Sequence, residues 1–479
     1  MSLKILSFLG ATEYLPCIYN FKDKEDKPTK YFQTAIGEYF FRDRLEDTKD
    51  KLIIFCTDKA LAYFNCRKED RIHEFEDDMW KGKKLQQELD ESEILRNRYV
   101  VKKVECEVND VWGLFECIFE EINEDDEIVF DLTNSFRILP LIAMVVLNFA
   151  KYVKNIKIKG IYYGAFEAVG NFKQVSELPL KRRIIPVYDM SNFNLLIDWI
   201  VGTEKYLSSG NAEMLKELII DTKDLENSKV IKDIEKKEIK LWIKKIEEFS
   251  EAVGVSNVIK IDKLGNEIKE SFPMAKSVVK NILPPLDKVM NKIEGNFEKY
   301  SPTETVKNIH ETVKWCCEHN MIQQAYTLFR ENIVTYIYER LNIEGRFKNN
   351  FNKYKYEKSR NYYRNLISCA LNNGYIILEK RRKKKNLNNL YNNYNYRKKP
   401  FDGMDIKKDD YEGNKKVIFD MLWNSKIDTE IYDIFYCIKN PRNEINHAGY
   451  VIYDELKNVD KKNLLNKAIK DFSRIIGLK

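Results

Sequence analysis

The sequence has few of the residues that form metal sites, disulfide frameworks or membrane segments. Only four of its 479 residues are histidine, and its nine cysteines include no C-x-x-C pair, as is typical of reduced thiols in a cytoplasmic protein. The longest apolar run, residues 138–150, contains Pro140 and Asn148 and is too short to span a bilayer. The opening MSLKILSFLG lacks the basic segment and cleavage site of a secretion signal. We therefore expect a cytoplasmic chain with no membrane segment and no metal site.

Two further absences concern ligands. Neither G-x-G-x-x-G nor G-x-x-x-x-G-K-[ST] occurs, which argues against an ordinary dinucleotide or nucleoside triphosphate site. The charge is nearly balanced, with 81 basic and 75 acidic residues and a formal net charge of +6. Contact with a nucleic acid must therefore come from a local patch rather than from a general positive field. The hydrophobic content of 44% is ample for folded cores, and the length predicts two or three domains.

Residues 1–190 alternate short β-branched runs with helix-like stretches. The expected strands are Leu3–Leu9, Lys51–Thr57, Tyr99–Cys106, Glu127–Thr133 and Ile156–Tyr163, and the expected helices between them include Val108–Ile122 and Phe136–Val153. The strands are continuous apolar runs, as expected where helices cover both faces of a sheet. Strand and helix in turn predict right-handed crossovers and a Rossmann-like parallel sheet.

Segments that contain small and hydroxyl residues lie at the carboxyl ends of four of these strands. They are Gly10, Ala11 and Thr12 after the first, Thr57 after the second, Thr133, Asn134, Ser135, Phe136 and Arg137 after the fourth, and Tyr163, Gly164 and Ala165 after the fifth. Ligands of an open parallel sheet bind at the carboxyl ends of its strands, where small residues let a phosphate approach the backbone. The other interpretation is a set of strand-to-helix turns capped by Thr and Ser. Taken singly, the residues do not decide between the two.

After Pro186 the pattern becomes helical and remains so. Charged amphipathic stretches fill residues 191–300, and further helices are expected over Thr303–His319 and Gln323–Leu341. This organisation predicts an α/β domain over residues 1–190, a helical linker domain over 191–300 and an all-α domain over 301–479. A basic, Asn- and Tyr-rich segment spans residues 379–400. It is either an arm that contacts RNA or a solvated insertion loop, and its low complexity favours the loop.

The chain reads K-N-P-R-N-E-I-N-H-A-G over residues 439–449. Asn440 is a good N-cap, Pro441 suits the first position of a helix, and Gly449 suits a helix end. These rules predict a helix that starts at Pro441. Arg442 would then lie in the first turn, beside free N–H groups that favour a phosphate.

Arg442, Asn443 and His447 are the predicted catalytic residues. The 2′-hydroxyl of RNA can attack its own phosphodiester when histidine moves the protons and a guanidinium stabilises the phosphoryl oxygens, so no metal is needed. Asn443 lies four residues before His447 and could orient the imidazole. Arg442 and His447 lie roughly 140° apart around a helix and do not converge on one phosphate, but a two-fold dimer would bring both pairs into one cleft. The alternative is a capped helix with a core histidine.

Together these segments resemble the CARF–HEPN ribonucleases of type III CRISPR systems, over essentially the whole chain. ILSFLGATEYLP is similar to the opening strand and loop of the CARF domain, DLTNSFR to its D-x-T-H-G-F element, and YYGAFEA to a further recurring segment. RNEINHAG is similar to the R-x(4–6)-H motif of HEPN domains, including the Asn that often follows the Arg. Asn134 and Ser135 stand where His-Gly is frequent in the family. The identity of the cyclic ligand, and whether the domain cuts it, are therefore left open.

The resemblance implies a homodimer, or an assembly of dimers, whose CARF domains bind a cyclic oligoadenylate activator, with cyclic tetra-adenylate as the first candidate. Binding would switch on metal-independent cleavage of single-stranded RNA in a composite HEPN site, with no cofactor. By position, the ligand loops are Gly10–Thr12 and Thr133–Arg137, followed by Thr57 and Tyr163–Ala165. A competing hypothesis is a nucleotide-sensing regulator that binds DNA through residues 191–300 without ribonuclease activity. That region shows no clear basic recognition helix.

Overall fold

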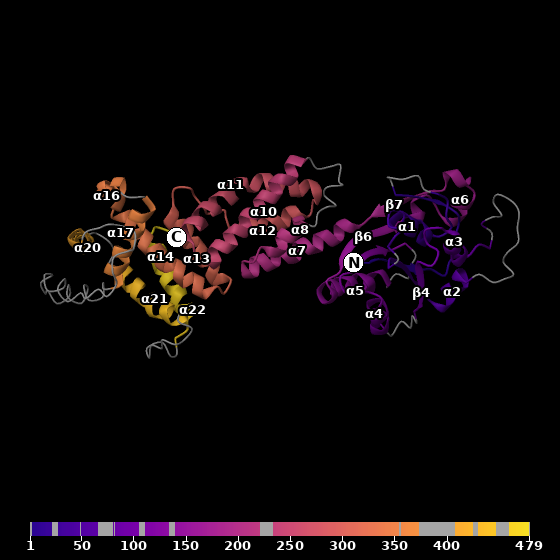
Figure 1. Cartoon of the computed structure of the whole chain (residues 1–479), viewed down its shortest axis with the longest axis horizontal. Helices are drawn as coiled ribbons and strands as arrows, with labels where there is room; N and C mark the ends of the chain where they lie inside the picture. Colours follow the sequence, from indigo (N-terminus) through magenta and orange to yellow (C-terminus); the bar gives the residue numbers. More distant parts are fainter. Residues whose placement is uncertain are drawn as a thin grey trace. The chain divides into compact units, whose positions relative to one another are not determined.

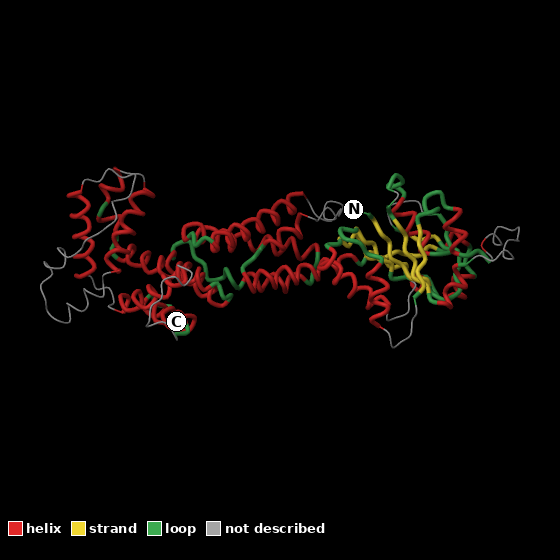
Figure 2. Tube along the Cα trace, turned by 60° about the horizontal axis from the view of Figure 1, so that its bottom comes forward, coloured by secondary structure: helices red, strands yellow, loops and turns green. Residues whose placement is uncertain are grey.

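The chain divides into two units, Met1–Ile197 and Asp198–Lys479. The computed structural model describes residues 2–21, 27–47, 49–65, 80, 82–104, 111–133, 139–220, 233–353, 356–372, 408–424, 430–446 and 459–478. The first unit is built around a β-sheet, and the described part of the second is helical (Figures 1 and 2). The predicted α/β part followed by an all-α part is therefore confirmed.

A seven-stranded sheet forms the centre of the first unit. Its strands are β1 (Leu3–Leu9), β2 (Ile18–Asn20), β3 (Lys51–Cys56), β4 (Tyr99–Lys103), β5 (Glu127–Asp131), β6 (Lys157–Gly164) and β7 (Ile184–Asp189), in the order β2-β7-β6-β5-β1-β3-β4. Strands β4, β3, β1, β5 and β6 are parallel, as predicted. Strand β7 runs antiparallel to β6 and pairs with β2. Neither β2 nor β7 was predicted, and the prediction that the chain is helical from Pro186 was wrong, because Pro186 lies within β7.

Helices cover both faces of the sheet. Their bounds are α1 (Phe32–Phe41), α2 (Asp58–Phe64), α3 (Leu85–Glu91), α4 (Val111–Glu120), α5 (Leu139–Lys154) and α6 (Phe172–Ser176), with 3-10 turns at Phe166–Ala168 and Leu180–Arg182. Leu3, Ile5 and Leu9 of β1 face the core beneath α1 and α3, whereas Leu6 and Phe8 face the core beneath α4 and α5. Because alternate side chains of β1 enter two different cores, the strand is apolar throughout.

The described part of the second unit consists of packed helices. They are α7 (Ser191–Ser209, which begins in the first unit), α8 (Glu213–Ile220), α10 (Asp233–Gly254), α11 (Val258–Ile282), α12 (Leu286–Glu294), α13 (Thr305–Glu318), α14 (Ile322–Arg340), α15 (Ile343–Arg346), α16 (Lys348–Lys353), α17 (Tyr356–Asn372), α20 (Lys408–Asn424), α21 (Glu430–Asn446) and α22 (Lys461–Ile475). Among the helices described, none has the length and apolar character needed to cross a bilayer. Because α11 packs against both α12 and α13, the division into domains 191–300 and 301–479 stays a prediction. The segment 379–400 lies outside the described residues.

His310 shows how this unit uses one of its few histidines. Its ring is fully buried and lies 5.6 Å from the ring centroid of Phe472, and its Nε2 is 2.6 Å from the hydroxyl of Ser473. Burial lowers the pKa of His310 to about 4, so the ring is neutral near pH 7. His310 therefore joins α13 to α22 as a core residue.

Candidate functional site

The predicted ligand loops meet at one edge of the sheet. Strands β1, β3, β5 and β6 run in the same direction, so Gly10, Thr57, Thr133 and Ala165 follow strand ends at the same edge. One contact joins two of the loops directly, because the Thr133 hydroxyl accepts a hydrogen bond of 2.8 Å from the backbone N–H of Gly164. Asn134, Ser135, Phe136 and Arg137 lie outside the described residues. The structure thus brings four loops together, but leaves their ligand a prediction.

Asp131 fixes the start of the loop after β5. Its side chain is buried, and it accepts hydrogen bonds from the Ser7 hydroxyl at 2.5 Å and from the backbone N–H of Thr133 at 2.7 Å. The second bond closes a turn of the chain onto its own side chain. The strand therefore ends at Asp131, two residues before the predicted end. Burial raises the pKa of Asp131 to about 6.

This burial predicts a pH-dependent difference in stability between the wild type and Asp131→Asn. The folded chain binds the proton of Asp131 more tightly than the unfolded chain, whose carboxyl titrates near pH 3.8. Ionising Asp131 therefore costs stability, by about 1.4 kcal/mol per unit of pKa shift. The cost is absent below about pH 4 and complete above about pH 6. We expect the unfolding free energy of the wild type, minus that of Asp131→Asn, to fall across this window in urea titrations.

The exposed Asp58, replaced by asparagine in the same way, is the matched control, because its side chain is 73% exposed. A difference between wild type and Asp131→Asn that stays constant from pH 4 to pH 7 would contradict the prediction.

Other predicted ligand residues have structural roles. Thr57 is the N-cap of α2 and accepts a hydrogen bond of 3.3 Å from the N–H of Ala60, as the capping interpretation requires. Gly164 must lack a side chain, because a Cβ atom there would come within 2.9 Å of the Phe32 ring. Ala165 is buried, and its N–H donates to the Pro186 carbonyl at 3.0 Å. These contacts explain the three residues without a ligand.

A cleft of about 400 Å³ beside the first loop was not predicted. The hydroxyl of Tyr14 donates to the carbonyl of Gly10 at 2.8 Å, and its ring lies 4.7 Å from the ring of Tyr31. The lining combines aromatic rings with basic groups, namely Tyr14, Tyr31, Tyr63, Trp80, Phe172, Lys30, Lys84 and Arg183. Rings stack on nucleobases and basic groups attract phosphates. These residues come from separate segments of the chain, so no local pattern could have indicated the cleft.

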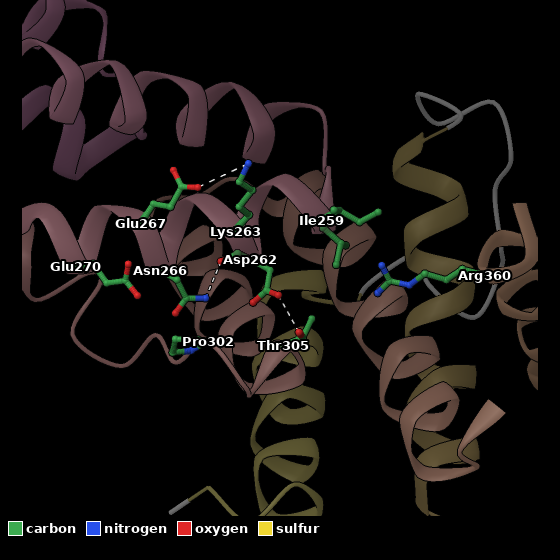
Figure 3. Close-up of a pocket in the computed structure, with 10 residues that line it drawn as sticks. Ile259, Asp262, Lys263, Asn266, Glu267, Glu270, Pro302, Thr305 and Arg360 are labelled. Atoms are coloured by element: carbon green, nitrogen blue, oxygen red, sulfur yellow. Dashed lines mark hydrogen bonds and ion pairs between the residues drawn. The ribbon is translucent and has the colours of Figure 1, made fainter. Parts of the chain in front are cut away.

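The helical unit has a cleft of about 370 Å³ between α11, the start of α13 and α17 (Figure 3). Asp262 lies in its wall and accepts a hydrogen bond of 2.8 Å from the Thr305 hydroxyl (Figure 3). It also accepts one of 2.6 Å from the Asn308 amide. Arg360 lines the cleft from α17. The carboxylate is thus engaged in joining α11 to α13, which explains its position without a ligand.

The predicted catalytic motif lies at the end of a helix rather than at its start. Helix α21 runs from Glu430 through Pro441 to Asn446, so the prediction of a helix that begins at Pro441 was wrong. Ile434 and Ile438 are buried, and the packing of this apolar face outweighs the hydrogen bond that Pro441 cannot donate. Arg442 therefore lies among the last carbonyls of the helix, where a cation is favoured, and not beside free N–H groups. His447 lies outside the described residues.

Arg442 is held by a residue that sequence reasoning missed. With its amide oriented toward the guanidinium, the Asn446 side-chain oxygen accepts hydrogen bonds from Nε of Arg442 at 3.0 Å and from Nη2 at 3.2 Å. Asn446 is one helical turn after Arg442, a spacing that could have indicated the pair. Burial, and then the positive charge of Arg330, lower the pKa of Arg442. Asn443 is half-buried in the same turn.

In the part of the chain that the structure describes, no three His, Cys, Asp or Glu side chains gather as a metal site would need. The predicted metal-independent reaction uses Arg442, which the structure describes, and His447, which lies outside the described residues. Metal independence therefore stays a prediction.

Two segments of the chain match known protein families. Residues 4–167 match the CARF domain of the CRISPR system endoribonuclease Csx1. Residues 195–304 match the second domain of the CRISPR-associated protein MJ1674. These two matches confirm the resemblance to CARF-containing CRISPR ancillary proteins that the sequence motifs predicted.

One curated relative is the CRISPR-associated protein MJ1674 of Methanocaldococcus jannaschii, with 26% identity over 339 residues. The match covers 63% of this chain and 48% of the relative, so the chain spans about half the length of that protein. Among solved structures, Enterococcus italicus Csm6 bound to cyclic hexa-2′-fluoro-hexa-dAMP is similar with a TM-score of 0.42 and 12% identity, over 99% of this chain and 94% of that chain. A likeness at this level carries no argument about function.

Proposed function

We propose that this protein is a ribonuclease that cuts single-stranded RNA when its CARF domain binds a cyclic oligoadenylate. The observation that carries the proposal is Arg442, which Asn446 orients at the end of α21, within the R-N-E-I-N-H motif. This residue occurs in a chain whose first 167 residues include a CARF domain. The motif and the domain together support an active site that depends on a ligand bound elsewhere.

The proposed chemistry divides between three residues. His447 moves protons between the 2′-hydroxyl, the phosphodiester and the 5′-oxygen of the leaving group. The Arg442 guanidinium stabilises the charge that develops on the phosphoryl oxygens, and Asn443 orients the imidazole. Attack by the 2′-oxygen breaks the bond between phosphorus and the 5′-oxygen. The products are a 2′,3′-cyclic phosphate and a 5′-hydroxyl, and no metal takes part.

An exposed apolar face supports the proposed homodimer. Leu141, Val145 and Phe149 are spaced four residues apart along α5, and their exposed fractions are 67%, 56% and 44%. Trp112, on the neighbouring α4, is 75% exposed. Apolar residues that gather in this way on a helix pair are typical of an interface. A second copy that presents the same face would cover it, as a two-fold dimer requires.

The proposal predicts that cleavage needs both the activator and His447. We expect labelled single-stranded RNA to be cut by the full chain when cyclic tetra-adenylate or cyclic hexa-adenylate is added, including in the presence of a chelator. His447→Ala should lower the cleavage rate by about 10²–10⁴-fold, the usual contribution of a general acid or base. Thermal melting with each cyclic adenylate serves as the control, because the variant should still be stabilised by the activator.

Full activity of His447→Ala would show that His447 is not a catalytic residue. Binding of duplex DNA that responds to the cyclic adenylate, with no RNA cleavage by the wild type, would instead identify a transcriptional or DNA-binding regulator.

A further inference from the structure

Arg330, on α14, lies beside the motif without belonging to it. Its Nη1 donates a hydrogen bond of 2.6 Å to Glu331, and its Nη2 donates to the hydroxyl of Ser368 on α17. The guanidinium carbon is 5.7 Å from the centroid of the Phe435 ring on α21. These contacts hold the planar group in one orientation on the side of α21 that carries Arg442, because Phe435 and Arg442 are seven residues apart, or two turns.

A third arginine converges on the same place. Arg364, on α17, donates to the Glu331 carboxylate at 3.1 Å, to the Glu331 carbonyl at 3.2 Å and to the Thr335 hydroxyl at 2.7 Å. The side chains of Arg330 and Arg364 are 19% and 14% exposed. Arg330 and Arg364 both hydrogen-bond Glu331, and Arg442 is close enough for the charges of Arg330 and Glu331 to act on it. Two carboxylates, Glu331 and Glu339, interact with these three guanidinium groups, which leaves an excess of positive charge in a partly desolvated place.

Such an excess is unfavourable unless an anion approaches it. Like charges repel more strongly where water is partly excluded, and each guanidinium offers paired N–H groups that match the oxygens of a phosphate. Arg364 directs three hydrogen bonds to Glu331 and Thr335 of α14, whereas Arg330 makes two, so the role of Arg364 is to hold Glu331. Arg330 and Arg442, whose charges interact where α14 packs against α21, are the pair available to an anion.

We infer that Arg330 and Arg442 form a two-arginine subsite for a phosphate of the RNA strand, with Glu331, Arg364 and Ser368 holding Arg330 in place. The inference rests on the proposed function, because it takes the anion that binds these arginines to be a phosphate of the RNA substrate. Arg330 is then a substrate-binding residue on a different helix from the motif. It would place the strand so that the scissile phosphodiester lies against Arg442.

Binding of a non-cleavable strand tests the inference without relying on cleavage. A 2′-O-methyl RNA is titrated into the full chain, with cyclic tetra-adenylate present, at several salt concentrations. Arg330→Gln should weaken binding about tenfold. It should also reduce the slope of log affinity against log salt by about 0.7, the change expected when one phosphate contact to a single strand is lost. Arg340→Gln, at an exposed position of the same helix, should change neither quantity.

Arg330→Lys keeps the inference testable if the glutamine variant is unstable. Lysine retains the charge but lacks the planar fork, so affinity should fall while the salt slope stays at the wild-type value. A wild-type slope and affinity for Arg330→Gln would overturn the inference, and so would a wild type that binds no RNA. A wild type that binds RNA with these salt effects but never cuts a cleavable strand would overturn the proposed function alone.

Discussion

Replacing Arg442 with alanine should lower the rate of RNA cleavage by about 10²–10³-fold, the usual cost of removing one donor that stabilises a developing oxyanion. The fold should remain, because Arg442 is half-buried and its hydrogen bonds reach only the next turn of its own helix. The measurement is single-turnover cleavage of a labelled strand at saturating cyclic tetra-adenylate, together with thermal melting of both proteins.

Arg474→Ala is the matched control for this loss. Arg474, on α22, pairs with Glu430 at 2.6 Å, but both side chains are more than half exposed, so the pair contributes little to stability. Its cleavage rate should equal that of the wild type. Asn446→Ala, which leaves the cation but removes its acceptor, should lose less activity than Arg442→Ala. Cleavage by Arg442→Ala within twofold of the wild type would exclude Arg442 from the active site.

The strands that could be predicted are those that are buried on both faces along their length. Strand β1 is buried on both faces and is apolar along its whole length, so its ends were predicted correctly. Strand β7 lies beside the short edge strand β2, its residues Ile184 and Tyr188 are both 47% exposed, and Pro186 interrupts it. Because of these features, β7 is not a continuous apolar run and could not be predicted as a strand on that basis. At the end of β5, the backbone N–H of Thr133 turns back to the Asp131 carboxylate, and Ser7, which is 124 residues away in the sequence, also hydrogen-bonds that carboxylate.

Some parts of the candidate sites could be predicted from the sequence and others could not. The loops at the sheet edge could be located because parallel strands place their carboxyl ends together. The start of α21 could not, because Asn440 and Pro441 satisfy the local rules for a helix start, whereas buried residues such as Ile434 and Ile438 continue the helix through them. The approach of Arg330 to Arg442 depends on the packing of α14 against α21, and no spacing within the sequence encodes it.

Mixed dimers of Arg442→Ala and His447→Ala chains should cut RNA although neither variant does so alone. Arg442 and His447 are five residues apart in the sequence, a spacing that separates two side chains on an α-helix by about 140°. One helix therefore does not present both groups to one phosphate. In a cleft shared by two chains, a mixed dimer retains one intact Arg442 and one intact His447, which suffices for the proposed chemistry.

The two variants are co-expressed with different affinity tags, and the mixed dimer is isolated by successive purification on both tags. Its cleavage rate is compared with the rates of the two pure variants under saturating activator. Adding Val145→Glu to both chains places a charge on the exposed apolar face of α5 and should abolish both the mixed dimer and the rescue. A mixed dimer that forms but stays inactive would show that each chain carries its own site. If Val145→Glu abolishes the rescue, the pairing of two chains through α5 of the CARF domain is also required to complete the active site. Dimer formation by the sensing domain would then control cleavage.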